Sequence, residues 1–106
     1  MTTKRVERAL ADFVADRDWA QFHTPGNLAK SIAIEAGELL ECYQWNEYPD
    51  EARVHEELAD VVTYCILLAN RLNVDLDQIV LDKLAVTESK YPVERSKGRS
   101  AKYDSL

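Results

Sequence analysis

Hydrophobic residues recur every three or four positions in four stretches of the chain, and polar segments separate these stretches. The stretches span about residues 3–16, 25–44, 51–72 and 76–90. Residues three and four apart share one side of a helix, so this spacing is typical of amphipathic helices. The pattern predicts an all-α protein with four helices in a single domain of residues 1–106.

Local signals predict where these helices begin and end. Thr24 followed by Pro25 is a typical helix start, because the threonine oxygen accepts a backbone hydrogen bond and proline fits the first helical position. Asp50 and Asp75 are expected to cap the next two helices in the same way. Pro92 should stop the fourth helix, which leaves residues 92–106 as a basic and partly irregular tail.

Charge and composition exclude several classes of protein. The formal net charge of −6 disfavours binding to nucleic acid, because an acidic protein repels a polyanion. No apolar run approaches the ~20 residues of a membrane span, and the charges spread through residues 1–20 do not form a signal peptide. The two cysteines are interpreted as buried thiols in a reducing compartment, so a cytoplasmic location is expected.

Two pairs of carboxylates lie on the flanks of apolar helix faces. Glu35 and Glu38 are three residues apart in the second helix, and Glu57 and Asp60 are three apart in the third. Bringing both pairs to a partly buried helix interface costs free energy unless their charge is neutralised. Protonation, pairing with Lys or Arg, and binding of a metal would each achieve this. Exposed acids at the margin of two helices remain the simpler alternative.

The donor set favours a hard cation if a metal is bound. Oxygen ligands without Cys or His at compatible spacing select Mg²⁺, Mn²⁺ or Ca²⁺. Because Mg²⁺ is usually completed by water and substrate phosphates, this arrangement indicates phosphate chemistry. A di-iron bundle is not supported, because neither His23 nor His55 completes a Glu-x-x-His pair.

Several segments together resemble the MazG-like nucleotide pyrophosphohydrolases of the all-α NTP pyrophosphatase superfamily. The resemblance covers residues 13–106 and points to the dCTP pyrophosphatase branch. It starts from the ExxE pattern of residues 35–38 and the ExxD pattern of residues 57–60. Further matching segments are Asp18 to Pro25, Gln44-Trp45, Tyr64, Asp75-Leu76, Lys90-Tyr91-Pro92 and Lys102-Tyr103.

This resemblance implies a four-helix bundle, assembled as a dimer of dimers with sites at subunit interfaces. It implies that the four acids hold Mg²⁺, with Mn²⁺ as a substitute, while water breaks the bond between the α and β phosphates. The substrate-binding residues would be Trp19, Phe22, His23, Asn27, Trp45, Tyr64 and Lys83. Thr87 departs from the family branch, which usually has Asn four residues after that lysine.

The residues leave part of the mechanism open. Either Glu35 or Glu38 could be the general base, and Glu38 is favoured because it lies further from the apolar face. The aromatic residues would bind any base, so choice of base is expected to come from hydrogen bonds by His23 and Asn27. We expect cytosine to be preferred. The alternatives are broader or different NTP specificity, including phosphoribosyl-ATP, and a non-catalytic helical module that binds a basic partner.

Overall fold

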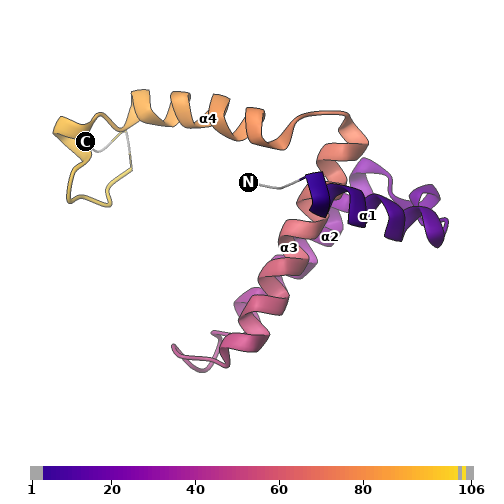
Figure 1. Cartoon of the computed structure of the whole chain (residues 1–106). Coiled ribbons are helices and arrows are strands. Elements are labelled where there is room, and N and C mark those ends of the chain that lie inside the picture. The colour runs from indigo at the N-terminus through magenta and orange to yellow at the C-terminus, as the bar shows by residue number, and fades with distance from the viewer. Residues whose placement is uncertain (1–3, 103, 105–106) are drawn as a thin grey trace. The chain divides into compact units, whose positions relative to one another are not determined.

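The chain folds into helices alone across the described residues, 4–102 and 104 of the computed structural model (Figure 1). The elements are α1 (Lys4–Asp16), the 3₁₀ turn η1 (Ala20–Phe22), α2 (Pro25–Glu41), α3 (Glu51–Leu72), α4 (Leu76–Lys90) and α5 (Val93–Ser96). The all-α class is therefore confirmed. Among these described segments, no helix has the length and apolar character needed to cross a membrane.

The capping residues act as the sequence predicts. The Oγ1 atom of Thr24 accepts from the backbone N–H of Asn27 at 3.1 Å, and α2 begins at Pro25. The Oδ1 atom of Asp50 accepts from the N–H of Ala52, and that of Asp75 accepts from the N–H of Gln78. Each bond satisfies a backbone donor that has no partner inside the helix.

The end of α2 differs from the prediction, and the structure adds a short helix in the tail. α2 ends at Glu41 rather than near residue 44, because Cys42, Tyr43 and Gln44 each donate to the carbonyl three residues earlier. Such bonds tighten the last turn and end an α-helix. The tail, predicted to be partly irregular, contains the short helix α5, whose first turn is closed by bonds from the N–H groups of Arg95 and Ser96 to the carbonyl of Pro92.

The chain divides into two units, residues 1–74 and 75–106. In the first unit, α2 and α3 lie side by side in opposite directions and α1 crosses α3 (Figure 1). Its buried apolar residues are Leu28, Cys42, Ile66 and Ala69. Two of these residues, Ile66 and Ala69, belong to α3. Because α3 has neighbours on two sides, its buried surface is wider than one stripe.

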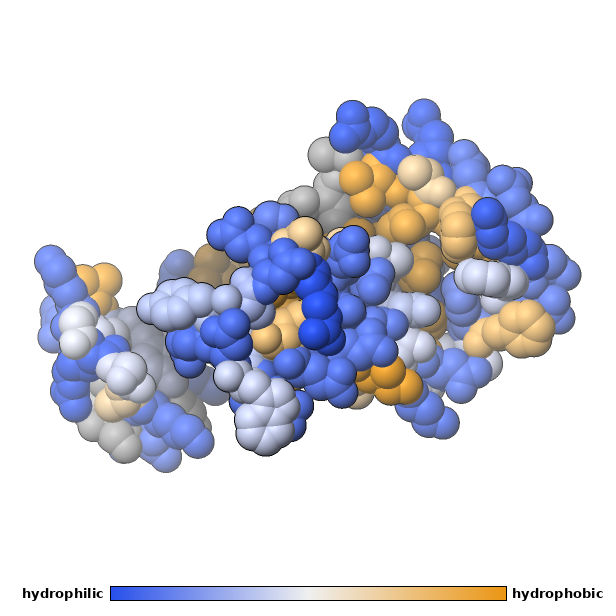
Figure 2. Space-filling model, turned by 90° about the horizontal axis from the view of Figure 1, so that it is seen from below, coloured by the Kyte–Doolittle hydropathy of each residue, from blue (hydrophilic) through white to orange (hydrophobic). Residues whose placement is uncertain are grey.

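The second unit contains α4 and α5. Apolar side chains of α4 remain well exposed on several sides of the helix: Ile79, Val80, Leu81, Leu84 and Val86. A helix with apolar residues around its circumference is usually buried in a larger structure. Figure 2 likewise shows apolar side chains (orange) at the surface of the chain, among hydrophilic ones. The chain therefore has apolar surface that its own core does not use.

Candidate active site

The packing of α2 against α3 brings the paired acids of the two helices together. One carboxylate oxygen each from Glu35, Glu57 and Asp60 lie within 4.8 Å of one another. Glu38 is close enough to hydrogen-bond with both Glu35 and Glu57. These four residues, called here the acid cluster, thus meet at one place, as their three-residue spacing on facing helices predicts.

Crowding of negative charge changes the acidity of the cluster. Hydrogen bonding with Glu38 is the main cause that raises the pKa of Glu35 from 4.5 to about 7. Partial desolvation and the nearby negative charges add to this increase. The pKa of Glu57 is also raised, first by desolvation and then by Glu38, while Arg53 opposes the rise. Desolvation disfavours the charged form of each carboxyl, and the neighbouring carboxylates disfavour a further negative charge beside them.

Two oxygen atoms of the cluster are unsatisfied. The Oε2 atoms of Glu35 and Glu57 are shielded from solvent, and neither has a hydrogen-bond partner among the described residues. An acceptor atom that is shielded from water and has no donor is destabilising, and more so when it is charged. Oxygen atoms of this kind, within 4.8 Å of further carboxylates, fit the ligand set of a hard divalent cation.

A hollow of about 300 Å³ lies between α1, η1 and α3, beside the acid cluster. Its lining is mainly apolar and aromatic: Leu10, Phe13, Val14, Trp19, His23, Asp60, Thr63, Tyr64 and Leu67. We call it the aromatic hollow. Asp60 belongs to both the aromatic hollow and the acid cluster, so the two share one wall. Trp19, His23 and Tyr64, three predicted substrate-binding residues, meet here.

A tight turn after α1 sets the position of Trp19. Asp18 has a φ of 53°, and the N–H groups of Asp18 and Trp19 donate to Ala15 and Val14. This is the Schellman pattern of helix termination, in which the residue after the left-handed one packs back on the helix. The Trp19 ring accordingly lies edge-on to the Phe13 ring, with centroids 5.5 Å apart.

The other predicted substrate-binding residues lie elsewhere. Phe22 and Trp45 do not line the aromatic hollow, and their side chains are 60% and 89% exposed. The Asn27 amide donates to the carbonyl of Phe22 at 3.0 Å, so it supports the turn before α2. Lys83 lies on α4 in the second unit, where its carbonyl accepts from the Thr87 hydroxyl at 3.1 Å.

Five lining residues were not predicted as site residues from the sequence: Leu10, Phe13, Val14, Thr63 and Leu67. Thr63 could have been found, because it lies three residues after Asp60 and therefore on nearly the same side of α3. Its hydroxyl makes no hydrogen bond within the described part of the chain, although a threonine hydroxyl inside a helix can bond to a carbonyl of the preceding turn. The α1 residues could not be assigned to the hollow from the sequence. Their periodicity shows that they share one face of a helix but not which other helix that face contacts.

Comparison with known proteins shows the family to which the chain is related. The sequence model of the MazG-like family matches residues 30–106. The chain is 40% identical to mouse dCTP pyrophosphatase 1 and 37% identical to the human protein, over 99% of its own length and 68% of theirs. The crystal structure of a pyrophosphatase from Archaeoglobus fulgidus superposes with a TM-score of 0.76 at 36% identity. The superposition covers 87% of this chain and 96% of the archaeal chain.

Proposed function

The chain belongs to the MazG-like family and is a nucleotide pyrophosphohydrolase, and on that premise we propose that it cleaves dCTP to dCMP and pyrophosphate with Mg²⁺. The observation that carries the proposal is the shared wall at Asp60. It sets a cluster of carboxylates beside a flat, largely apolar hollow. A nucleotide has the same two parts, a charged phosphate chain and an aromatic base.

The acid cluster would hold Mg²⁺ through Glu35, Glu38, Glu57 and Asp60. When bound, Mg²⁺ would neutralise phosphate oxygens and lower the pKa of an attacking water. Glu38 remains our preferred general base, with Glu35 as the alternative. The raised pKa of Glu35 supports that alternative, because proton transfer is most effective when the pKa of the base is near the working pH.

The aromatic hollow would hold the base. Trp19 and Tyr64 offer rings for stacking, which contributes about 1–3 kcal/mol per base in proteins that bind nucleic acid strands. His23 and Thr63 offer the hydrogen bonds that distinguish one base edge from another. The relatives named dCTP pyrophosphatase 1 support cytosine as the preferred base. Lys83 is proposed to contact the phosphates, and Trp45 and Phe22 to complete the nucleoside pocket.

The exposed apolar residues support assembly into a homotetramer, a dimer of dimers. Only four apolar residues of the described chain are buried, while α4 exposes five large apolar side chains. A chain of 106 residues gains stability by covering such surface with further copies. In an assembly of this kind, exposed Trp45 would approach a hollow of another copy.

The test is a screen of pyrophosphate release from all canonical and 5-substituted dNTPs, with and without Mg²⁺. We expect the highest kcat/KM with a cytosine nucleotide, formation of dCMP rather than dCDP, and no turnover in EDTA. In ¹⁸O-labelled water, the label shows which phosphorus is attacked. Label in dCMP indicates attack on the α phosphorus, and label in pyrophosphate indicates attack on the β phosphorus.

A matched pair of variants links the activity to the acid cluster. Glu35→Gln removes a charge from the cluster, and Glu41→Gln makes the same change on the exposed side of α2. We expect loss of activity only in the first. Equal activity in both, or turnover that does not depend on a divalent cation, would contradict the proposed function and favour a module that binds a basic partner.

A further inference from the structure

Arg17 lies beside the aromatic hollow without lining it. Its guanidinium carbon is 3.8 Å from the centroid of the Phe13 ring, and its Nη1 donates to the Phe13 carbonyl at 3.2 Å. The first contact is a cation–π interaction, and the second fixes the guanidinium on the helix that carries the ring. Arg17 therefore restrains the Phe13 side chain, which lines the aromatic hollow.

Phe13 transmits this restraint to Trp19. The planes of the two rings meet at 80°, the T-shaped geometry that aromatic pairs prefer. Both rings line the aromatic hollow, whereas Arg17 does not. A change at Arg17 can therefore reach a ligand in the hollow only through these two rings or through its long-range charge.

The backbone around this contact is also fixed. Asp18 adopts the left-handed conformation that non-glycine residues rarely take, with a φ of 53°. The Gln21 amide donates to the carbonyl of Asp18 at 2.9 Å and to its Oδ2 atom at 3.1 Å. The main chain that carries Trp19 is thus held independently of Arg17, so loss of the arginine should free the ring without unfolding the turn.

We propose that Arg17 is a positioning residue for the base, which orients Trp19 through Phe13 before the nucleotide binds. This inference rests on the proposed function. Fixing a rotatable side chain at a binding surface costs free energy during association, and a side chain that is already fixed does not incur that cost. Trp19 would contribute equally to the bound substrate and the transition state, so its positioning should act on KM and leave kcat unchanged.

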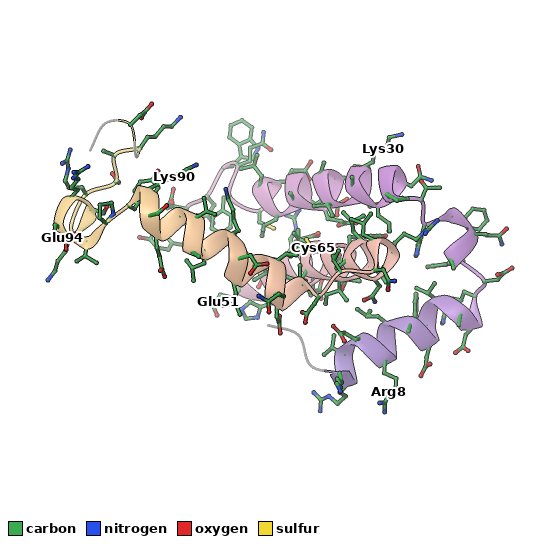
Figure 3. The ribbon with its side chains drawn as sticks, turned by 90° about the horizontal axis from the view of Figure 1, so that it is seen from above. Arg8, Lys30, Glu51, Cys65, Lys90 and Glu94 are labelled. Carbon is green, nitrogen blue, oxygen red and sulfur yellow. The ribbon has the colours of Figure 1, made fainter. Side chains whose placement is uncertain are left out.

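The test compares Arg17→Ala with Arg8→Ala, which makes the same charge change on the same helix. Figure 3 shows the Arg8 side chain pointing away from α2 and α3. For the preferred nucleotide, we expect Arg17→Ala to raise KM about two- to fivefold, the effect of one exposed cation–π contact. The value of kcat should stay within about twofold. Arg8→Ala should leave both constants unchanged, and Arg17→Lys, which keeps the cation, should restore part of the lost affinity.

A Trp19→Leu background separates positioning from charge. In that background, Arg17→Ala should have no further effect on KM, because the ring on which it acts is absent. An undiminished effect there, an equal effect of Arg8→Ala, or a fall in melting temperature without a change in KM would each overturn the proposal. If the unaltered protein releases no pyrophosphate from any nucleotide, the proposed function fails and this inference fails with it. If the unaltered protein is active but Arg17→Ala leaves KM unchanged, the positioning role of Arg17 is excluded and the proposed function stands.

Discussion

Glu35 on α2 and Glu57 on α3 each turn one oxygen, Oε2, into a position shielded from solvent, where neither atom meets a hydrogen-bond donor from the described residues. Both atoms belong to carboxylates with raised pKa values. Two such groups across a helix interface are satisfied either by protons or by a cation. The same geometry therefore makes the stability of the protein depend on pH and on divalent metal together.

We expect the metal-free protein to become less stable as the pH rises from about 4.5 to 7. The pKa of Glu35 is raised to about 7 in the folded chain from its ordinary value of 4.5. In this window the folded state keeps a proton that the unfolded state has released, so the free energy of unfolding decreases with pH. Melting temperatures at pH 5 and pH 8 in EDTA measure this, and Mg²⁺ should raise the value more at pH 8.

Glu35→Gln is the control for this dependence. The variant cannot titrate at this position, so its metal-free melting temperature should fall less between pH 5 and pH 8 than that of the unaltered protein. An equal fall in both proteins would assign the pH dependence to other groups.

Glu35→Gln and Asp60→Asn should each lower kcat/KM by more than about 100-fold, because each removes a charge that would hold the cation at the reacting phosphates. Stability without metal should hold or rise, since each change relieves repulsion within the acid cluster. Activity assays with Mg²⁺ and thermal denaturation in EDTA test both parts. A variant with near-normal turnover would remove that residue from the mechanism.

Thr63→Val and His23→Ala should narrow the preference for cytosine over other bases. Valine keeps the shape of threonine but removes the hydroxyl that lines the aromatic hollow, at a typical cost of about 0.5–1.5 kcal/mol for a lost hydrogen bond. The ratio of kcat/KM for dCTP and dTTP measures the effect. Thr63→Ser, which keeps the hydroxyl, should retain the preference, and an unchanged ratio in Thr63→Val would exclude a contact with the base.

Asn27→Ala is expected to act on stability instead. The Asn27 amide donates to the Phe22 carbonyl, so its removal should lower the free energy of unfolding by about 1 kcal/mol. The ranking of bases should then stay the same. A changed ranking with unchanged stability would return Asn27 to the base-binding residues, as the sequence first suggested.

Trp45→Ala should raise KM for all nucleotides, because about 1–3 kcal/mol of stacking free energy would be lost. The order of preference among the bases should change little. Because Trp45 is 89% exposed and outside the aromatic hollow, it would reach a base from another copy of the chain. Mixing subunits of Trp45→Ala with subunits of Glu35→Gln should then restore sites with full affinity. Mixtures that equal the average of the two variants would show that each site is built by one chain.

Sedimentation should find a homotetramer. The reason is that α4 carries exposed apolar side chains on several sides. Only one side of a helix can pack within its own unit, so the remaining apolar sides need contact with another copy of the chain. Leu81→Glu should shift the distribution toward smaller species if this residue lies in a subunit contact. An active monomer of the unaltered chain would contradict the assembly.

The sequence predicted features that depend on neighbours along one helix. Thr24, Asp50 and Asp75 were found as caps because a cap and its partner lie two or three residues apart. The acid cluster was found because its pairs share helix faces. Phe13 was not assigned to the hollow, since only the crossing of α1 over α3 brings it there. The early end of α2 depends on backbone bonds to the carbonyl three residues earlier, and no residue type in this segment marks that change.

Asp60 connects the acid cluster with the aromatic hollow, so binding at one of them would be linked to binding at the other. One carboxylate borders both the acid cluster and the aromatic hollow, so an occupant of either place changes the charge and orientation that the other meets. Such a linkage is reciprocal: the factor by which a cation strengthens nucleotide binding is also the factor by which the nucleotide strengthens cation binding. If the cation and the nucleotide bind as proposed, a cleaved product that loses its charged end would give up this mutual gain, and Asp60 would then favour release of the product as well as binding of the substrate.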